Sequence, residues 1–135
     1  MLTQTKIKRV NLTFDSGLEF IWQLEDSYEQ KETNNFLSLV SLDFKKNFIK
    51  FREQIEEGIL NKEAIELYIY FLSIKKNSDE GMRFYEVYWI KRSKEHRKDF
   101  WQREHGRATI VLKARDNNEN PRFLLFDIEG SNPFE

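Results

Sequence analysis

The N-terminal part of the chain shows an alternation of apolar and polar residues. Two alternating runs flank the tripeptide at residues 15–17: Val10, Leu12 and Phe14 come before it, and Leu18, Phe20, Trp22 and Leu24 come after it. A period of two places the apolar side chains on one face of a strand, and a short connection that ends in glycine suits a hairpin, because glycine adopts positive φ without a side-chain penalty. Residues 6–24 are therefore predicted to form a β-hairpin, and the acidic stretch 25–35 an exposed connection.

A different period begins after this connection. The large apolar residues now recur at intervals of three and four: Phe36, Val40, Phe44, Phe48, Phe51 and Ile55. This spacing places side chains on one face of an α-helix. Asn34 or Asn35 can cap the start of the helix, and Gly58 can end it in the left-handed conformation. We therefore predict a long helix over about residues 35–57, whose apolar side packs against the core.

Residues 64–74 are apolar almost throughout, so their period does not separate a buried helix from a buried strand. Asn61 and the two charged residues after it resemble a helix start. The aromatic and β-branched residues at 68–71, and the turn-forming residues 77–81, instead favour a strand that enters a hairpin. The strand is the preferred alternative, and residues 82–91 are then predicted to return beside it.

The segment that follows predicts a short surface helix. Ser93 suits an N-cap and Gly106 suits a helix end. Between them, Phe100 and Trp101 are the only large apolar residues, so the helix would lie on the surface with its basic side exposed. Ahead of the C-terminus, alternation at two further stretches separated by turn-forming residues predicts a closing hairpin over 108–128.

These elements combine into a single α+β domain over residues 1–135. An antiparallel sheet built from hairpins packs against one long amphipathic helix, and a short basic helix lies on the surface. The length of 135 residues is typical of one domain, and five glycines and two prolines leave little material for a linker. Residues 130–135 are interpreted as a probable flexible tail, although Phe134 could fold back onto the body.

Several kinds of site are not predicted. The chain has no cysteine, which excludes disulfides, thiolate metal sites and cysteine nucleophiles. Its glycines are isolated and form no phosphate-binding loop, so no cofactor is expected. His96 and His105 would project from opposite sides of one helix and could not share a metal there. No apolar run has the length of a signal peptide or a membrane span, so we expect a cytoplasmic protein that does not bind a membrane.

The candidate binding surface is a basic segment at residues 83–107, which holds eight lysines and arginines and four acids in a chain of net charge −1. The residues assigned to this surface are Arg92, Lys94, Arg97, Lys98, Trp101, Arg103 and Arg107. Arginine and tryptophan are enriched among binding hot spots, and cations with exposed rings also suit phosphates and bases. A protein partner is the preferred binding hypothesis, and an acidic one would complement the basic charge of this segment. Nucleic acid is the alternative, and a solvated surface without a partner is the simplest interpretation.

A metal site is a further alternative. Asp127 and Glu129 fall on one side of the last predicted strand, and Glu86 lies in the middle of an aromatic strand. Three carboxylates could hold a divalent cation in a nuclease-like site. The lysine that would stand two residues after a catalytic glutamate is missing, because Tyr88 and Ser131 occupy those positions. A solvated strand end is the simpler explanation of the two C-terminal acids.

The sequence therefore favours a small, non-enzymatic binding module that acts through protein–protein contact, of the kind represented by inhibitors, immunity proteins and antitoxins. A nucleic-acid-binding accessory protein and a metal-dependent enzyme are the alternatives. An exposed sheet edge could also pair two copies of the chain, so a homodimer remains open.

Overall fold

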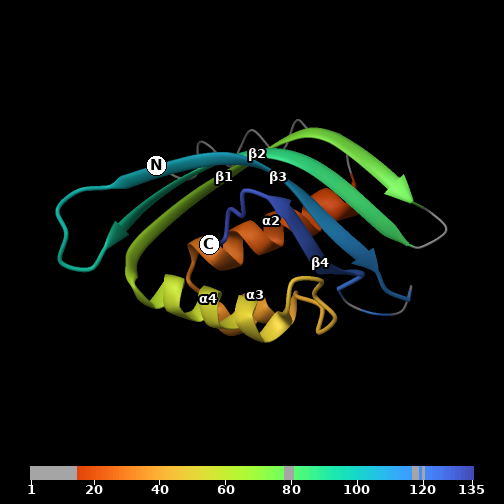
Figure 1. Ribbon diagram of the computed structural model, residues 1–135, viewed down its shortest axis with the longest axis horizontal. Helices are drawn as coiled ribbons and strands as arrows, with labels where there is room; N and C mark the ends of the chain where they lie inside the picture. The colour runs from red at the N-terminus through yellow and green to blue at the C-terminus, as the bar shows by residue number, and fades with distance from the viewer. Residues whose placement is uncertain (1–14, 78–80, 117–118, 120) are drawn as a thin grey trace.

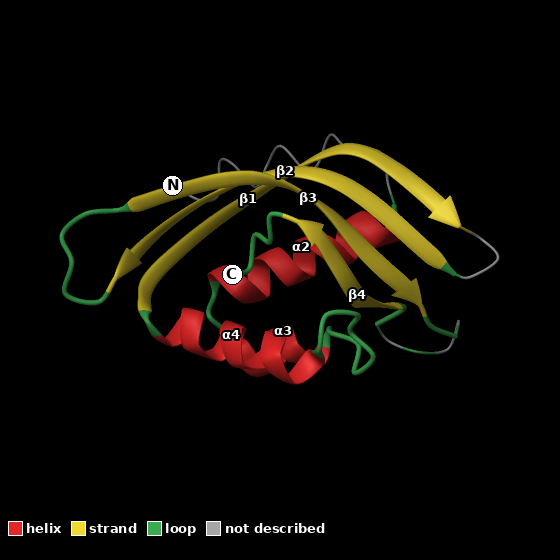
Figure 2. Ribbon diagram, viewed as in Figure 1, coloured by secondary structure: helices red, strands yellow, loops and turns green. Residues whose placement is uncertain are grey.

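A curved antiparallel sheet arches over three helices in the computed structural model, which describes residues 15–77, 81–116, 119 and 121–135 (Figure 1). The helices are α2 (Ser16–Glu29), α3 (Thr33–Ser38) and α4 (Phe48–Leu60). The strands are β1 (Lys62–Asn77), β2 (Met82–Glu95), β3 (Gln102–Ala114) and β4 (Phe123–Gly130), and they lie in the order β1-β2-β3-β4. The helices lie on the concave side of the sheet (Figure 2). The predicted α+β class with an antiparallel sheet is confirmed.

The first helix, α2, replaces the second strand of the predicted N-terminal hairpin, whose first strand lies outside the described residues. The Asp15 carboxylate caps α2 by accepting hydrogen bonds from the backbone N–H groups of Gly17 and Leu18. Four of the five buried apolar residues of the helix follow one another at helical spacing, namely Leu18, Ile21, Leu24 and Tyr28, and Phe20 is buried beside them. The alternation between residues 18 and 24 was therefore a misleading signal, because a three-and-four period runs through the same residues.

The predicted long helix is interrupted between α3 and α4. The intervening segment pairs with β4: Ser41 donates its backbone N–H to Leu125, and Lys45 donates to Phe126. Asn47 then caps α4 with its side chain and has a positive φ of 81°. The expected caps at Asn34 or Asn35 and at Gly58 are wrong. The apolar stripe nevertheless packs in the core, because all its residues except the half-buried Phe48 are buried, even where the backbone is not helical.

The two predicted C-terminal hairpins are confirmed. Strands β1 and β2 pair antiparallel along their length with two register shifts, and β4 pairs antiparallel with residues 108–114 of β3 with one register shift. The predicted short helix after Ser93 is wrong, because β2 continues to Glu95 and β3 begins at Gln102. The physical reason is the pairing of these strand ends: Arg92 lies opposite Arg103, and Ser93 lies opposite Gln102. Within the described residues, no helix is long and apolar enough to cross a membrane.

Candidate functional site

The middle of the concave face is formed by β2, whose side chains alternate between the two faces of the sheet. The residues that face the interior are buried: Tyr85, Val87, Trp89, Lys91 and Ser93. The first three line the apolar core, but the last two carry polar atoms into it. Lys91 is only 2% exposed and Ser93 only 1%. Buried lysines are rare and are normally paired, so this end of β2 is the first place to search for a site.

Lys91 has an incomplete set of partners. Its ammonium group lies 3.4 Å from the hydroxyl of Tyr28 in α2, and it also donates to the main-chain oxygen of Glu135. The rings of Tyr28 and Trp89 lie 5.5 and 5.8 Å from the same nitrogen. A carboxylate oxygen of Glu104 is 3.9 Å away on a half-exposed side chain. One long hydrogen bond, one main-chain oxygen and one peripheral carboxylate compensate a buried charge only partly.

Burial also shifts the ionisation of this pair. It lowers the pKa of Lys91 below the usual 10.5, although the carboxylates of Glu104 and Glu135 act against the shift. Burial raises the pKa of Tyr28 above its ordinary value, and the negative charge of Glu104 adds to this effect. Tyr28 therefore keeps its proton at neutral pH. The two side chains present N–H and O–H donors within reach of a single oxygen atom of a ligand.

Ser93 adds a further polar group. Its hydroxyl oxygen is fully buried and has no hydrogen-bond partner in the described part of the chain. A buried hydroxyl without a partner costs free energy, so such a group needs an explanation. We refer to Tyr28, Lys91 and Ser93, with the two residues that cover them, Phe134 and Glu135, as the Lys91 site. It combines apolar aromatic walls with a few convergent donors, which is the composition typical of small-molecule sites.

The C-terminal residues lie against this site, as Figure 1 shows for the chain end beneath the sheet. Of the two interpretations that the sequence left open for residues 130–135, the structure has Phe134 folded back, with its ring only 1% exposed. The ring packs edge-on against Phe36 and Tyr28, with centroids 5.0 and 5.3 Å apart. Beside these residues, a pocket of about 240 Å³ is lined by α4, β4 and the chain end: Phe44, Lys46, Lys50, Phe51, Gln54, Ile128, Gly130, Asn132 and Glu135.

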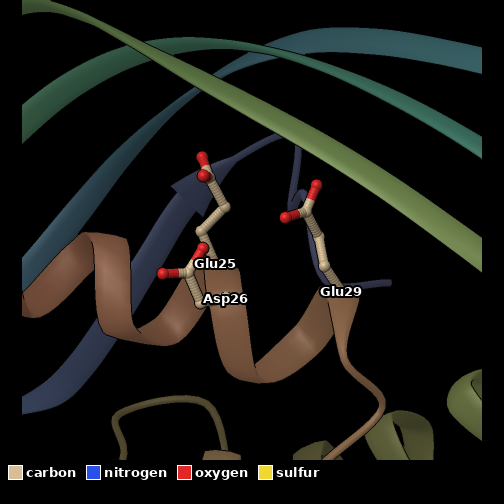
Figure 3. A group of neighbouring side chains, drawn as sticks. All are labelled: Glu25, Asp26 and Glu29. Carbon is tan, nitrogen blue, oxygen red and sulfur yellow. The ribbon is translucent and has the colours of Figure 1, made fainter. Parts of the chain in front are cut away.

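A second group of polar side chains lies on α2 and contains Glu25, Asp26 and Glu29, whose oxygen atoms are within 4.8 Å of one another. Figure 3 shows Glu25 and Glu29 rising toward β1. Glu29 accepts the backbone N–H of Leu67 at 2.7 Å, and Glu25 accepts that of Ile69 at 3.0 Å.

The spacing of residues along a helix and along a strand explains why Glu25 and Glu29 both reach backbone N–H groups of β1. Four helical residues rise about 6 Å and two strand residues rise about 6.8 Å, so the two carboxylates meet alternate amides of the outer strand β1. Glu25 and Glu29 therefore attach α2 to the sheet. The interpretation of residues 25–35 as an exposed acidic connection is wrong for both glutamates, which are buried.

The residues predicted to bind a partner lie around the β2–β3 turn. Arg92 and Lys94 are on β2, Arg103 and Arg107 are on β3, and Arg97, Lys98 and Trp101 lie between the strands. The register places Arg92 opposite Arg103 and Tyr88 opposite Arg107, so both β3 arginines share the convex face with Arg92. This is the face opposite the Lys91 site.

Part of the basic charge on this surface is matched by β1. Arg92 pairs with Glu66 at 2.8 Å, and Lys94 pairs with Glu63 at 3.0 Å. Arg92 also lies 4.9 Å from the ring of Trp101, which remains 40% exposed. The docking of a protein or a nucleic acid on these residues stays a prediction.

The three acids of the predicted metal site are not among the described carboxylate groups close enough to share an ion. Glu86 and Glu129 line one shallow hollow on the sheet, but Asp127 is buried rather than part of a solvated strand end. Its carboxylate accepts the backbone N–H of Ile128 and lies 3.7 Å from Lys46.

The sequence does not predict the Lys91 site, because the predicted strand ends at residue 91 whereas β2 continues to Glu95. The alternation that places Tyr85, Val87 and Trp89 on one face also places Lys91 and Ser93 there once the strand continues. The basic residues around Ser93 favoured a helix start instead. No signal in the local sequence joins Tyr28 or the chain end to this strand, because the contacts of Lys91 with Tyr28 and with Glu135 span 63 and 44 residues of the chain.

Comparison with known proteins identifies the fold. No protein-family model and no curated protein matches the sequence. Among solved structures, an NTF2-like superfamily protein from Salmonella enterica is 12% identical, with a TM-score of 0.68 over 85% of this chain and 87% of that one. A putative scytalone dehydratase from Novosphingobium aromaticivorans is 7% identical, with a TM-score of 0.70 over 96% of this chain and 89% of that one. The chain has an NTF2-like fold.

The NTF2-like fold is an α+β cone-like fold that includes both enzymes and non-enzymes. ActVI-ORFA from Streptomyces coelicolor shares it with a TM-score of 0.62 at 10% identity, over 85% of this chain and 93% of that one. The prediction of a module that acts through protein–protein contact is wrong, because these neighbours point to a fold for ligand binding or catalysis. The Lys91 site lies inside the cone and is a second candidate functional site beside the basic surface.

The lowered pKa of Lys91 predicts a pH dependence of stability. In the unfolded chain the lysine titrates near 10.5, whereas the buried amine loses its proton at lower pH. Between the two pKa values the unfolded state binds more protons, so the parent gains stability as the pH rises. The free energy of unfolding of Lys91→Met, measured relative to the parent by urea denaturation, is therefore expected to fall between pH 7 and 10. The fall is at most about 1.4 kcal/mol per pH unit.

Lys113→Met is the matched control for this measurement, because Lys113 also lies on a strand but has an exposed side chain. The difference in free energy of unfolding between Lys113→Met and the parent should stay nearly constant over the same pH range. Equal pH profiles for the two variants would show that Lys91 is not buried in a charged state.

Proposed function

We propose that this NTF2-like protein binds a small, largely apolar molecule inside the cone and holds an oxygen atom of that molecule on Lys91 and Tyr28. The observation that carries the proposal is the partly compensated ammonium group of Lys91 in an aromatic interior. A ligand oxygen would accept from Lys91 and from the Tyr28 hydroxyl, and so supply the missing compensation. The hydroxyl of Ser93 offers a further polar contact on the same face.

The apolar part of the ligand is supported by the walls of the site. Tyr28 contacts Phe36 and Phe134, with centroid distances of 6.0 and 5.3 Å. Phe36 lies 6.3 Å from Phe51, which also lines the pocket beside the chain end. Aromatic walls continue in this way from the Lys91 site to the pocket. Rings of this kind bind apolar groups by burial and by edge contacts.

We further propose that the protein binds its ligand without transforming it. The three buried acids of the described residues each accept a main-chain N–H: Glu25 from Ile69, Glu29 from Leu67 and Asp127 from Ile128. His96 and His105 are exposed near the β2–β3 turn and on β3. The candidate general bases are thus engaged with the backbone or lie outside the interior, which supports binding rather than proton transfer. The cytoplasmic location expected from the sequence is retained as part of the proposal.

The test compares 4-phenylbutan-2-one with butylbenzene, which has the same carbon skeleton without the oxygen. Ligand-detected saturation-transfer NMR should show that the parent binds the ketone at least about tenfold more tightly, because a well-made hydrogen bond to a charged donor contributes roughly 1.5–3 kcal/mol. Lys91→Met should remove this preference, and the exposed-site control Lys113→Met should retain it. An unchanged preference in Lys91→Met would refute the proposed function. So would the failure of both probes to contact the parent and the folded chain-end variants Phe134→Ala and Asn132→Ala.

The same samples address catalysis. In D₂O, a base positioned next to the ketone would exchange its α-protons for deuterium. We expect no exchange above the background rate. Protein-dependent exchange that disappears in Lys91→Met would show that the protein is an enzyme and would overturn the proposal of binding without turnover.

A further inference from the structure

The chain end places an aromatic ring and an oxygen atom together in the Lys91 site. The ring of Phe134 fills the space between Tyr28 and Phe36. The main-chain oxygen of the following residue, Glu135, accepts a hydrogen bond from Lys91. An aryl group and an oxygen acceptor one residue apart therefore satisfy both the aromatic walls and the buried amine. The chain end shows what chemistry the interior accepts.

The attachment of this segment to the rest of the protein changes at Ser131. The indole N–H of Trp89 donates to the main-chain oxygen of Ser131 at 2.8 Å, and the backbone N–H of Ser131 donates to Arg107 at 2.9 Å. After Ser131, the backbone N–H groups donate locally: that of Phe134 donates to the side chain of Asn132 at 2.8 Å, and that of Glu135 to the main-chain oxygen of Asn132. Residues 132–135 are thus held to the body chiefly by the Phe134 ring and by Lys91.

The charges along the approach favour an anion. The pocket beside the chain end carries Lys46 and Lys50 at its rim and the rings of Phe44 and Phe51 on its walls. Glu135 lines this pocket and contacts Lys91, so it lies between the pocket and the buried amine. Asp127 lies 3.7 Å from Lys46 and compensates the charge of that lysine. A ligand carboxylate that enters through the pocket would therefore meet first Lys50 and then Lys91.

We infer that the ligand of the Lys91 site is an aromatic carboxylate, which displaces residues 132–135 and takes the positions of the Phe134 ring and the Glu135 oxygen. This inference rests on the proposed function and names its ligand class. The carboxylate of the ligand takes the place of the Glu135 main-chain oxygen beside the ammonium group of Lys91, and its aryl group takes the place of the phenyl ring of Phe134. Charge-assisted hydrogen bonds are stronger than those to a neutral oxygen.

The test uses 3-phenylpropanoate, which has the phenyl group and two-carbon spacer of 4-phenylbutan-2-one but ends in a carboxylate. Isothermal titration of the full chain should show at least tenfold tighter binding of the acid to Phe134→Ala than to the parent, because the competing ring is removed. Adding Lys91→Met to Phe134→Ala should weaken the binding of the acid at least tenfold, and it should weaken the binding of the ketone by a smaller factor. Phe134→Leu, which keeps most of the buried volume, should bind the acid nearly as weakly as the parent.

Asn132→Ala provides a second route if Phe134→Ala does not fold, because it removes the side-chain acceptor of the Phe134 N–H without emptying the core. The acid should bind this variant more tightly than the parent. Acid binding that is equal in the parent and in the folded variants would overturn the inference. A ketone that binds through Lys91 while the acid does not would refute the inference and leave the proposed function intact. Failure of both probes on every folded variant would refute both.

Discussion

Gly17→Ala is expected to lower the free energy of unfolding by about 3 kcal/mol, at the upper end of the usual cost of overpacking. A methyl group at this position would lie 1.8 Å from the hydroxyl oxygen of Tyr85 and 2.6 Å from its ring. Tyr85 is completely buried and donates to Asp15 at 2.8 Å, so it has little room to move. The substitution should therefore also disturb the Asp15 cap of α2, and chemical denaturation measures the combined loss.

Gly58→Ala is the matched control for this substitution. Gly58 lies inside α4, and a methyl group there would meet no atom within 4 Å. Alanine is favoured over glycine in a helix by about 1 kcal/mol, so this variant should be more stable than the parent. Opposite signs at the two glycines are the expected result. A Gly17→Ala variant as stable as the parent would mean that Tyr85 does not pack against the start of α2.

Phe44→Ala is expected to lower the free energy of unfolding by about 3–5 kcal/mol, which is a large part of the stability of a typical domain. The ring of Phe44 is buried and stacks on that of Phe51, with centroids 4.5 Å apart and planes inclined by 17°. Its removal would leave a cavity beside the segment that pairs with β4, where the backbone is already fixed by hydrogen bonds to Leu125 and Phe126. Thermal and urea denaturation would measure the loss.

Phe48→Ala separates this structure from the continuous helix that the sequence predicts. In such a helix Phe44 and Phe48 occupy equivalent positions of one stripe, so both substitutions should cost the same. In the structure Phe48 is the first residue of α4 and only packs against the edge of the core. Its loss should cost about 1–2 kcal/mol, near the centre of the range for single substitutions. Equal losses at the two positions would contradict the break between α3 and α4.

The sequence by itself determined the strands that pair with near neighbours in the chain. Strands β1 and β2 are joined by a short turn, and β3 and β4 by a connection of eight residues, so local turn signals and alternation were sufficient to identify them. The apolar stripe from Phe36 to Ile55 likewise identified core residues correctly, because burial depends on side-chain polarity whatever the backbone does.

The tertiary structure decided where local signals competed. Residues 39–47 have helical spacing, but their backbone groups bond to β4, which a local pattern does not contain. Asp15 begins a helix rather than a hairpin turn, and its cap is supported by Tyr85 from a strand 70 residues away. Local propensities differ by only about 1 kcal/mol per residue, so contacts of this kind override them.

The candidate site depended on such contacts more than any other part of the molecule. Lys91 has the sequence context of a surface lysine, and it is buried only because β2 continues past it and α2 and the chain end close over it. The polarity of a lysine predicts that its side chain is exposed. Lys91 is buried instead because the apolar residues around it pack together away from water and enclose it. The sequence therefore determined the sheet and most of the core. The packing of distant segments brought together the amine of Lys91, the phenol of Tyr28 and the ring of Phe134.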